Sequence, residues 1–330
     1  MDDPARPSRR AVLGAAGLGA AGLAAAGLGG CARDAAGVPV VLATGAPAGV
    51  YHRLGSALVA LWRAELGAPA TLLGSQGSVD NVGMLAAGRA DVAFCAVDVA
   101  VDGAVDGARP PRPLQALARV HDDAVHVVVP AASPVRRLAD LRGRRVSIGA
   151  PNSGVLVIAP RLLATVGLTP EADLAAVQLG LGESVAALRD GAIEAFFWSG
   201  GVPTAGVEDL ARTVPVRLLD LGEQLDALRR AYPVYDVTTV PARSYGLPDP
   251  VTTLSVRNVL VVTAGLATPT ARGLTRVLLD RVDTLASADP AGRSVDPRTA
   301  IGTQPVPLHD GAREAFRAAK VAGSRAVHGG

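Results

Sequence analysis

The chain has 330 residues, a length that exceeds one ordinary hydrophobic core and suits two domains. Lys and Arg total 32 against 30 Asp and Glu, so the formal net charge is +2, which argues against a nucleic-acid-binding protein with its concentrated basic surface. Hydrophobic residues make up 49% of the chain, and this fraction excludes global disorder.

The first thirty residues predict an export signal rather than part of the fold. Residues 11–30 contain only Ala, Gly, Leu and Val, and they follow Arg9 and Arg10 as in twin-arginine export signals. Seven of these 20 residues are glycine, which makes the run a poor membrane-spanning helix. The run ends at Leu28-Gly29-Gly30-Cys31, which is similar to a bacterial lipobox with Cys31 as the lipidated residue.

We therefore expect a lipoprotein held at the outer face of the cell membrane through Cys31, with residues 31–37 as a tether. Export through the Sec pathway is the alternative to the twin-arginine route. The GxGxxG pattern at residues 17–22 lies inside the signal, without the preceding strand that a nucleotide site needs, so no cofactor is expected. Cys95 is then the one cysteine of the mature sequence and lies in an apolar run, which predicts a buried thiol.

Strands and helices alternate over the first part of the mature chain. Apolar runs predict strands at 38–42, 71–73 and 91–97, and helical spacing of apolar residues predicts helices at 51–66 and 79–87. Loops that contain Gly, at 44–49 and 74–78, lead from strand to helix.

A similar order recurs roughly one hundred residues later. The predicted strands are 145–148, 175–179 and 193–198, the predicted helices are 155–166 and 184–188, and a Gly/Ser loop covers 149–154. The junction at 88–91 corresponds to the junction at 191–194. Alternating strands and helices imply parallel sheets with right-handed crossovers, and two such units predict an α/β protein with two lobes.

Two apolar, β-branched segments, 124–130 and 252–263, are expected to carry the chain between the lobes as a strand hinge. Lobe 1 then comprises 38–124 plus 259–330, and lobe 2 comprises 125–258. Further helices, from 269 to about 288 and from 310 to about 321, are expected to pack on lobe 1.

The Gly/Ser loops are the best candidates for a ligand site, because ligands of parallel sheets bind beyond the carboxyl ends of the strands. Ser75, Gly77 and Ser78 let a ligand approach the backbone, and Ser78 as helix cap would leave amide groups free for an anion. An ordinary cap is the alternative. Ser153 and Gly154 form the second loop, and together the loops predict a cleft between the lobes.

Other polar residues are less specific. Ser199 and Gly200 end a strand and predict either the far wall of the cleft or a turn. Asp98 follows a strand and predicts either a cleft residue or a helix cap. His121, Asp122 and Asp123 could chelate a metal, but a solvated turn before the hinge strand is favoured. Without an HExxH pair or a GxSxG elbow, neither a metal site nor an enzyme is expected.

The mature chain resembles the TAXI (TRAP-associated extracytoplasmic immunogenic) solute receptors, the binding subunits of a class of TRAP transporter. The matching segments are spread from about 40 to 316. They include Thr44-Gly45 with Gly49-Val50-Tyr51, Gly74 to Asn81, Asp140 to Gly154, and Gly201-Val202-Pro203. The chain departs from the family at Tyr51-His52, where a second tyrosine is usual.

This resemblance implies a type II periplasmic-binding-protein fold that closes on a glutamate-like amino acid or an organic acid. It adds Thr44, Gly45, Tyr51 and Asn81 to the ligand-binding residues, with Glu183 facing an ammonium group. The expected protein is a monomer that delivers a small carboxylate-containing solute to a TRAP membrane subunit. The alternatives are a receptor for a sensor kinase or an ABC-type system and, less favoured, a hydrolase on the same scaffold.

Overall fold

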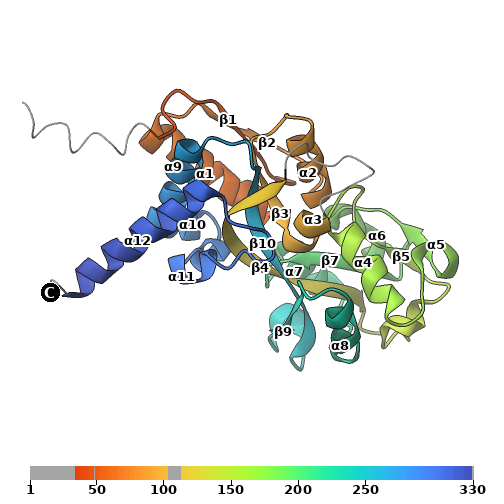
Figure 1. The fold of residues 1–330 in the computed structure, drawn as a ribbon. Coiled ribbons are helices and arrows are strands. Elements are labelled where there is room, and N and C mark those ends of the chain that lie inside the picture. The colour runs from red at the N-terminus through yellow and green to blue at the C-terminus, as the bar shows by residue number, and fades with distance from the viewer. Residues whose placement is uncertain (1–33, 48, 103–112, 329–330) are drawn as a thin grey trace, which may run out of the picture.

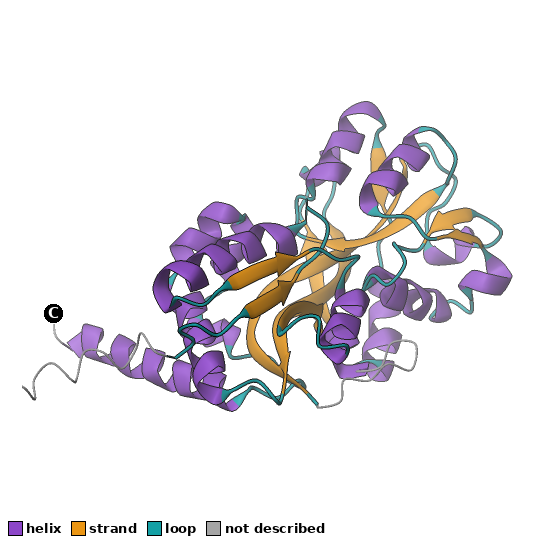
Figure 2. Cartoon of the chain, turned by 90° about the horizontal axis from the view of Figure 1, so that it is seen from above, coloured by secondary structure: helices purple, strands orange, loops and turns teal. Residues whose placement is uncertain are grey.

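The computed structural model describes residues 34–47, 49–102 and 113–328, so Cys31 and the export signal lie outside the described residues. Ten strands form one sheet in the order β2-β1-β3-β10-β4-β7-β5-β6, with β8 paired to β4 and β9 paired to β10 (Figure 1). Helices cover both faces of this sheet (Figure 2). Within the described ranges, no helix combines the length and the apolar character that crossing a bilayer requires.

Lobe 1 is built on three parallel strands: β1 (Val40–Ala43), β2 (Ala70–Leu73) and β3 (Val92–Ala96). Its first helices are α1 (Val50–Leu66), α2 (Ser78–Ala86) and α3 (Val97–Asp102). Each of the first two helices follows one of the Gly-containing loops, as the sequence predicts. Helix α3 corresponds to the helix-cap alternative at Asp98, but its bounds do not follow from the sequence, because it continues the apolar run of β3 without a turn residue between them.

Lobe 2 repeats this plan with β5 (Arg145–Ser147), β6 (Ala175–Val177) and β7 (Ala195–Gly200), which are also parallel. Its helices are η2 (Leu138–Leu141), α4 (Val155–Ala164), α5 (Pro170–Asp173), α6 (Leu181–Arg189) and α7 (Ala205–Thr213). It is completed by β8 (Val216–Leu218), α8 (Gly222–Ala231), β9 (Asp236–Val240) and η3 (Ser244–Gly246). Residues 216–240 thus hold two strands and a helix that the sequence pattern does not predict.

Two long antiparallel strands, β4 (Leu114–Pro130) and β10 (Val251–Thr263), join the lobes. Strand β4 pairs with β10 as far as Ala124 and then with β7 of lobe 2, while β10 changes its partner from β9 to β3 between Ser255 and Asn258. The first crossing strand is longer than predicted, because the polar residues at 119–123 interrupt the apolar pattern without ending the strand.

The chain returns to lobe 1 through α9 (Thr268–Asp280), α10 (Val282–Ala288), η4 (Pro290–Ser294), α11 (Pro297–Ala300) and α12 (Asp310–His328). The predicted helix after 269 is broken at Arg281, whose φ of −121° and ψ of 34° are not helical. Helix α12 is longer than predicted and projects from the body of the molecule (Figure 1).

Three groups of buried apolar side chains form the core. One packs α1, α9 and α12 on lobe 1, where fully buried Trp62 donates from Nε1 to the Leu274 carbonyl oxygen (3.3 Å). A second surrounds Phe196 in lobe 2. The third runs across both lobes without a break and contains Cys95, which confirms the predicted buried thiol. Burial raises the pKa of the Cys95 thiol well above its usual range.

Candidate functional site

The carboxyl ends of β1 and β3 lie on the lobe 1 side of the contact between the two lobes. The Thr44 carbonyl oxygen accepts hydrogen bonds from Ser75 Oγ (2.8 Å) and Asn81 Nδ2 (2.7 Å). Asn81 is fully buried and also donates from Nδ2 to the Phe94 carbonyl oxygen (2.8 Å). These predicted residues are therefore held together, with Asn81 tying β1 to β3.

Tyr51, in the first turn of α1, extends this network toward the hinge. Its ring stacks on Phe94 with 4.9 Å between centroids. Its hydroxyl lies 3.3 Å from Ser78 Oγ and donates to Asn258 Oδ1 on β10. Burial raises the pKa of the Tyr51 phenol well above its usual range, so the group stays a protonated donor. Gly45 lies beside this ring, and a Cβ there would make an ordinary contact 3.6 Å from Tyr51 Cβ, so the ring does not require glycine at this position.

Ser78 does not cap α2 as predicted. The N-cap residue is Gly77, and Ser78 Oγ instead accepts a hydrogen bond from the Ala96 amide (2.9 Å). The hydroxyl is thus used to join the helix start to the end of β3. Of the first-turn amides, that of Asp80 donates to the Asn152 carbonyl oxygen of lobe 2 (3.1 Å).

The two Gly/Ser loops meet where lobe 1 and lobe 2 touch. A Cβ added to Gly77 would lie 3.3 Å from Ser153 Cα, and one added to Gly154 would lie 3.4 Å from Ser78 Oγ. Gly77 also has a φ of +131°, a conformation that favours glycine. The loops that the sequence assigns to opposite walls therefore touch, and the two lobes are closed on each other.

The remaining lobe 2 residues line the end of β7 and the start of α4. Ser153 Oγ donates to the Ala150 carbonyl oxygen (2.8 Å), while Ser199 Oγ donates to Asp123 Oδ2 on the hinge strand (3.3 Å). Gly200 pairs with Ala124 and packs under the Trp198 indole, where a Cβ would lie 2.4 Å from Nε1. Ser199 is thus the predicted residue that links lobe 2 to the hinge.

The expectation of a solvated turn at residues 121–123 is wrong. These residues lie inside β4, and His121 is only 2% exposed. Its ring stands edge-on to Tyr51 with 5.8 Å between centroids. The sequence carried a signal for this arrangement, because His121 and Asp123 are two residues apart and therefore share one face of a strand.

Asp98 lies in the first turn of α3 rather than at its cap position. Its Oδ1 accepts from the Val99 amide (2.9 Å), and its Oδ2 accepts from the Tyr235 hydroxyl of lobe 2 (2.7 Å). Arg161 of α4 lies 3.7 Å from the same oxygen and also pairs with Asp102. Burial raises the pKa of the Asp98 carboxyl, although the Tyr235 hydrogen bond and the Arg161 charge oppose this shift. Asp98 thus joins the two lobes through its hydrogen bond with Tyr235.

Glu183 is exposed and belongs to the start of α6. Its Oε2 accepts a hydrogen bond from the Gly180 amide (2.9 Å), so the carboxylate serves as a local helix cap. Contact between Glu183 and a solute stays a prediction. In the part of the chain that the structure describes, no three His, Cys, Asp or Glu side chains are grouped so that they could hold a metal ion.

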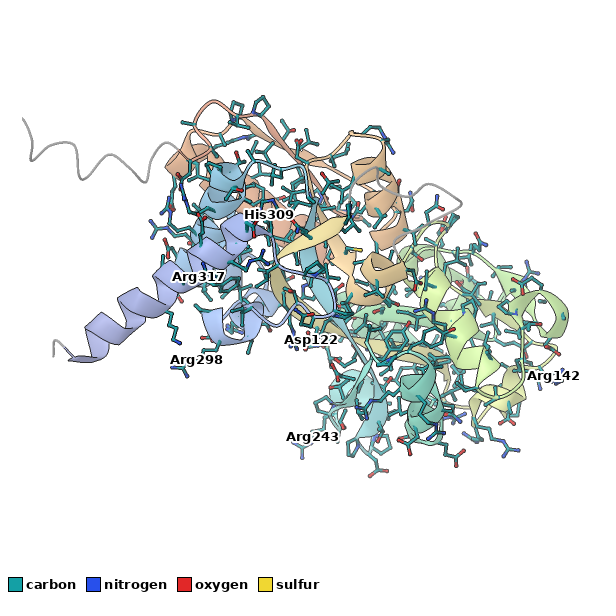
Figure 3. All side chains as sticks on the ribbon, in the orientation of Figure 1. Asp122, Arg142, Arg243, Arg298, His309 and Arg317 are labelled. Atoms are coloured by element: carbon teal, nitrogen blue, oxygen red, sulfur yellow. The ribbon has the colours of Figure 1, made fainter. Side chains whose placement is uncertain are left out.

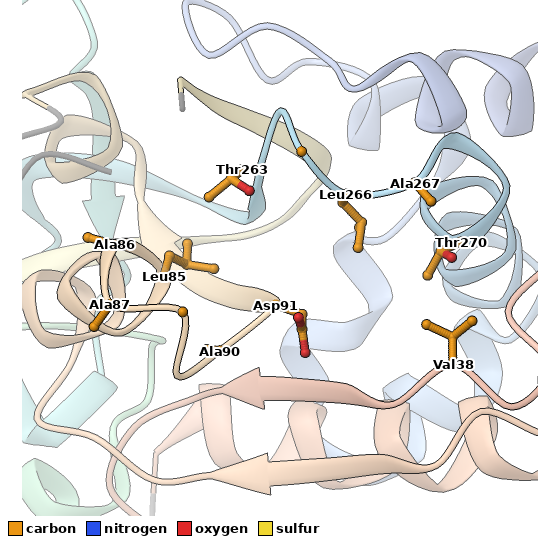
Figure 4. A pocket seen from close by; sticks show the side chains of 12 residues that line it. Val38, Leu85, Ala86, Ala87, Ala90, Asp91, Thr263, Leu266, Ala267 and Thr270 are labelled. Carbon is orange, nitrogen blue, oxygen red and sulfur yellow. The ribbon is translucent and has the colours of Figure 1, made fainter. Parts of the chain in front are cut away.

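A separate pocket of about 620 Å³ lies in lobe 1 at the opposite ends of the strands. It is bordered by Val38 before β1, Asp91 before β3, and Leu266 and Thr270 near the start of α9 (Figure 4). Because β1 and β3 begin at this pocket and end at the contact between the lobes, the pocket is distinct from the candidate site at the two loops.

Two α/β lobes, joined by two long antiparallel strands and closed over loops at the strand ends, define the type II periplasmic-binding-protein fold. The NMT1-like family model matches residues 42–319, and the chain belongs to the NMT1-like family.

Solved structures resemble this chain over most of its length. XAC2383 from Xanthomonas citri, bound to chloride, is 17% identical with a TM-score of 0.50, covering 84% of this chain and 95% of that one. The alkanesulfonate-binding protein SsuA from Xanthomonas axonopodis pv. citri, bound to MOPS, is 18% identical with a TM-score of 0.47, covering 86% of this chain and 92% of that one. At 17% identity, the likeness to XAC2383 concerns the fold.

Proposed function

We propose that the protein is an extracytoplasmic solute-binding lipoprotein that captures a small carboxylate-containing solute and delivers it to a TRAP-type transporter. One observation carries this proposal. The Gly77–Ser78 loop of lobe 1 and the Ser153–Gly154 loop of lobe 2 touch where the strands end, which supports a site that closure completes from both halves.

The first turn of α2 supports the assignment of a carboxylate. The Ser78 and Val79 amides make no hydrogen bond to another described residue, while the Asp80 amide already bonds to lobe 2. Free amides at a helix start attract an anion because they combine unpaired donors with the positive end of the helix dipole. In the proposed cycle, this turn holds the carboxylate, and closure then adds Ser153, Gly154 and Ser199.

The proposed partner is a TRAP membrane subunit, and lobe closure also supports this choice. Closure brings the two lobes together around the hinge, so the surface they present jointly reports whether solute is bound. A TRAP membrane subunit that recognises this surface would accept solute from the closed form. The resemblance to TAXI receptors supports this choice, and a gene for a fused large TRAP membrane subunit beside this gene is the expected genomic arrangement. Genes for an ABC permease and ATPase there instead would overturn it.

A thermal-shift screen of the mature protein with amino acids and organic acids tests the binding function. A solute that binds only the folded protein stabilises it by about 2.7 kcal/mol at one hundred times its Kd, which is a readily measured rise in Tm. The absence of a shift with every compound, in a folded sample, would contradict the proposal.

A matched pair of variants tests closure itself. In Gly154→Val the new side chain would occupy the seam beside Ser78 Oγ, so the Tm shift caused by solute should be lost. Gly182→Val is the control, because a Cβ at this helix position meets nothing within 4 Å. Equal Tm shifts in the two variants would show that binding does not require the lobes to close.

A further inference from the structure

A series of polar contacts crosses from lobe 2 to lobe 1 through Tyr235. The Tyr235 hydroxyl accepts a hydrogen bond from Arg161 Nη1 of α4 (2.8 Å) and donates one to Asp98 Oδ2 of α3 (2.7 Å). Arg161 also pairs with Asp102 of α3. The Arg161 guanidinium lies over the Tyr232 ring, 4.2 Å from its centroid. An arginine and a tyrosine of lobe 2 thus hold two carboxylates of lobe 1.

These contacts are shielded from water. Tyr235 and the Asp98 side chain are 0% exposed, and the Arg161 side chain is 12% exposed. Burial raises the pKa of Tyr235 well above its usual range, so the hydroxyl stays protonated and can donate. Hydrogen bonds to charged groups are stronger in such surroundings than at the surface, where ion pairs contribute little. The contacts between the lobes are therefore of the kind that affects an equilibrium.

The hinge holds the segment around Tyr235 in place. Arg257 of β10 donates from Nη2 to the Val234 carbonyl oxygen (3.2 Å), and its Nε lies 3.4 Å from Asp236 Oδ2. The same guanidinium donates from Nη1 to the Gln304 carbonyl oxygen of lobe 1 (2.8 Å). Both neighbours of Tyr235 in the chain are thus fixed to the hinge strand, which positions the hydroxyl for its partners.

The division of these residues between the lobes links them to closure. Asp98 and Asp102 belong to lobe 1, whereas Arg161 and Tyr235 belong to lobe 2, so a rotation that separates the lobes breaks their contacts. Water can replace the lost partners in an open form. In the closed form, loss of one partner leaves the buried Asp98 carboxylate poorly compensated, which is costly. The complete set of contacts therefore favours the closed form.

We propose that Tyr235 and Arg161 form a latch that holds the two lobes closed without solute. Asp98 and Asp102 are the residues to which the latch attaches, so Asp98 serves closure rather than contact with the solute. This inference goes beyond the proposed function, because it concerns the equilibrium between open and closed forms of the solute-free protein. A closed form that is already populated lowers the cost of binding, so the latch should also tighten binding of the solute.

Tyr235→Phe tests the latch, with Tyr232→Phe as the matched control. Phenylalanine keeps the buried ring but removes the hydroxyl that bonds to Arg161 and Asp98, so the ratio of closed to open form should fall roughly tenfold to a hundredfold. The Tyr232 hydroxyl makes no hydrogen bond to another described residue, and Tyr232→Phe keeps the ring that Arg161 covers. The ratio should therefore stay at its wild-type value in the control.

Small-angle X-ray scattering of the solute-free mature protein measures this ratio. Arg142, near the outer end of lobe 2, and Arg317, on α12 of lobe 1, lie at opposite ends of the molecule (Figure 3), so opening changes the overall dimensions. All proteins carry Cys31→Ser, so that no lipid is attached. We expect a larger radius of gyration in Tyr235→Phe and the wild-type radius in Tyr232→Phe. A lowered Tm at an unchanged radius would show that the Tyr235 hydroxyl only stabilises the fold, and would overturn the latch.

Arg161→Gln is the second variant, in case Tyr235→Phe does not fold. It removes the charge that faces Asp98 and Asp102 from a side chain that reaches the surface, and it should enlarge the radius of gyration in the same direction. The wild-type radius in every latch variant that folds would overturn the latch and leave the proposed function standing. Failure of the solute screen would count against the proposed function alone, because scattering is measured without solute.

Discussion

The two lobes place a nine-residue helix at the same point of their sheets but use its fourth residue differently. In lobe 1 this residue of α2 is Asn81, which donates to the carbonyl oxygens of Thr44 and Phe94. In lobe 2 the corresponding residue of α6 is Ser184, whose Oγ lies 2.8 Å from Ser147 Oγ. Both are buried, yet the first joins two strand ends through their carbonyl oxygens, while the second bonds to one side chain and one nearby carbonyl oxygen.

Only in lobe 1 does the hydrogen-bond network around this residue extend to the candidate site. There the network continues through Ser78 and Tyr51 to Asn258 on the hinge strand. In lobe 2, both hydroxyls of the serine pair lie 3.4 Å from the Leu179 carbonyl oxygen, and the pair ends there. The comparison indicates that the hydrogen-bond network of lobe 1 extends to the hinge, so under the proposed function lobe 1 and the hinge would hold the solute-binding groups and lobe 2 would cover them.

The largest expected effect on stability comes from replacing the fourth residue of α2 in lobe 1 and of α6 in lobe 2. Asn81→Ala deletes a fully buried amide and leaves the Phe94 carbonyl oxygen without this donor, so the free energy of unfolding should fall by about 2–4 kcal/mol. Ser184→Ala deletes one hydroxyl and should cost about 1 kcal/mol. Urea unfolding of both variants measures the difference, and equal losses would contradict the unequal roles assigned to the lobes.

Gly77 of lobe 1 and Gly154 of lobe 2, which lie where the two loops touch, should also respond differently to substitution by alanine. Gly77 has φ +131° and ψ −157°, a region that only glycine adopts freely, so Gly77→Ala should destabilise the protein by about 1–3 kcal/mol. Gly154 has φ −62° and ψ −30°, which alanine adopts readily, and its new Cβ would make ordinary contacts. Gly154→Ala should therefore change the unfolding free energy by less than about 0.5 kcal/mol. A larger loss in this variant than in Gly77→Ala would refute the assignment of strain to lobe 1.

The contact between Asp98 of lobe 1 and Tyr235 of lobe 2 should depend on pH. Burial raises the pKa of Asp98 in the folded protein above its ordinary value of 3.8, so the folded state favours the protonated carboxyl. As the pH falls through the raised pKa, the wild type should gain stability relative to Asp98→Asn, which cannot titrate. The gain should be complete only below the unfolded value.

Melting curves of the wild type and Asp98→Asn between neutral pH and pH 3.8 measure this gap. Asp102→Asn is the control, because it removes the more exposed of the two carboxylates that Arg161 contacts. A gap between wild type and Asp98→Asn that stays constant over the range would contradict a raised pKa for Asp98.

The sequence predicts the parts of the fold that follow from local pattern. The alternation of apolar runs and Gly-containing loops locates β1, β2, β3 and the helices after them, because each element has its own period and its own stop signal. The same logic pairs the two Gly/Ser loops across a cleft. It fails for β4 before Ala124, because polar residues interrupt the apolar pattern there and the strand is defined by its pairing with β10, which is a tertiary effect.

The partners of individual side chains were harder to predict. Ser78 reads as a cap, yet its hydroxyl is taken by the Ala96 amide, which is 18 residues away. Asp98 meets Tyr235 across 137 residues. His121 looks like a turn residue because histidine and two aspartates are polar, and only the strand pairing with Asn258 turns it inward. Such contacts depend on the three-dimensional pairing of segments, which a single sequence does not reveal.

The smallest expected effect on stability concerns a junction that occurs once in each lobe, just before β3 and just before β7. Asp91 Oδ2 accepts from the Val41 amide (2.8 Å) before β3, and Glu194 Oε2 accepts from the Arg145 amide (3.2 Å) before β7. Because water can replace partly exposed carboxylates such as these, Asp91→Ala and Glu194→Ala should each cost no more than about 1 kcal/mol. Chemical unfolding should give equal losses within about 0.5 kcal/mol, the usual scatter of surface substitutions. Clearly unequal losses would mean that the two junctions have the same geometry but contribute differently to the free energy of unfolding. The difference between the lobes would then extend beyond the residues near the contact between them.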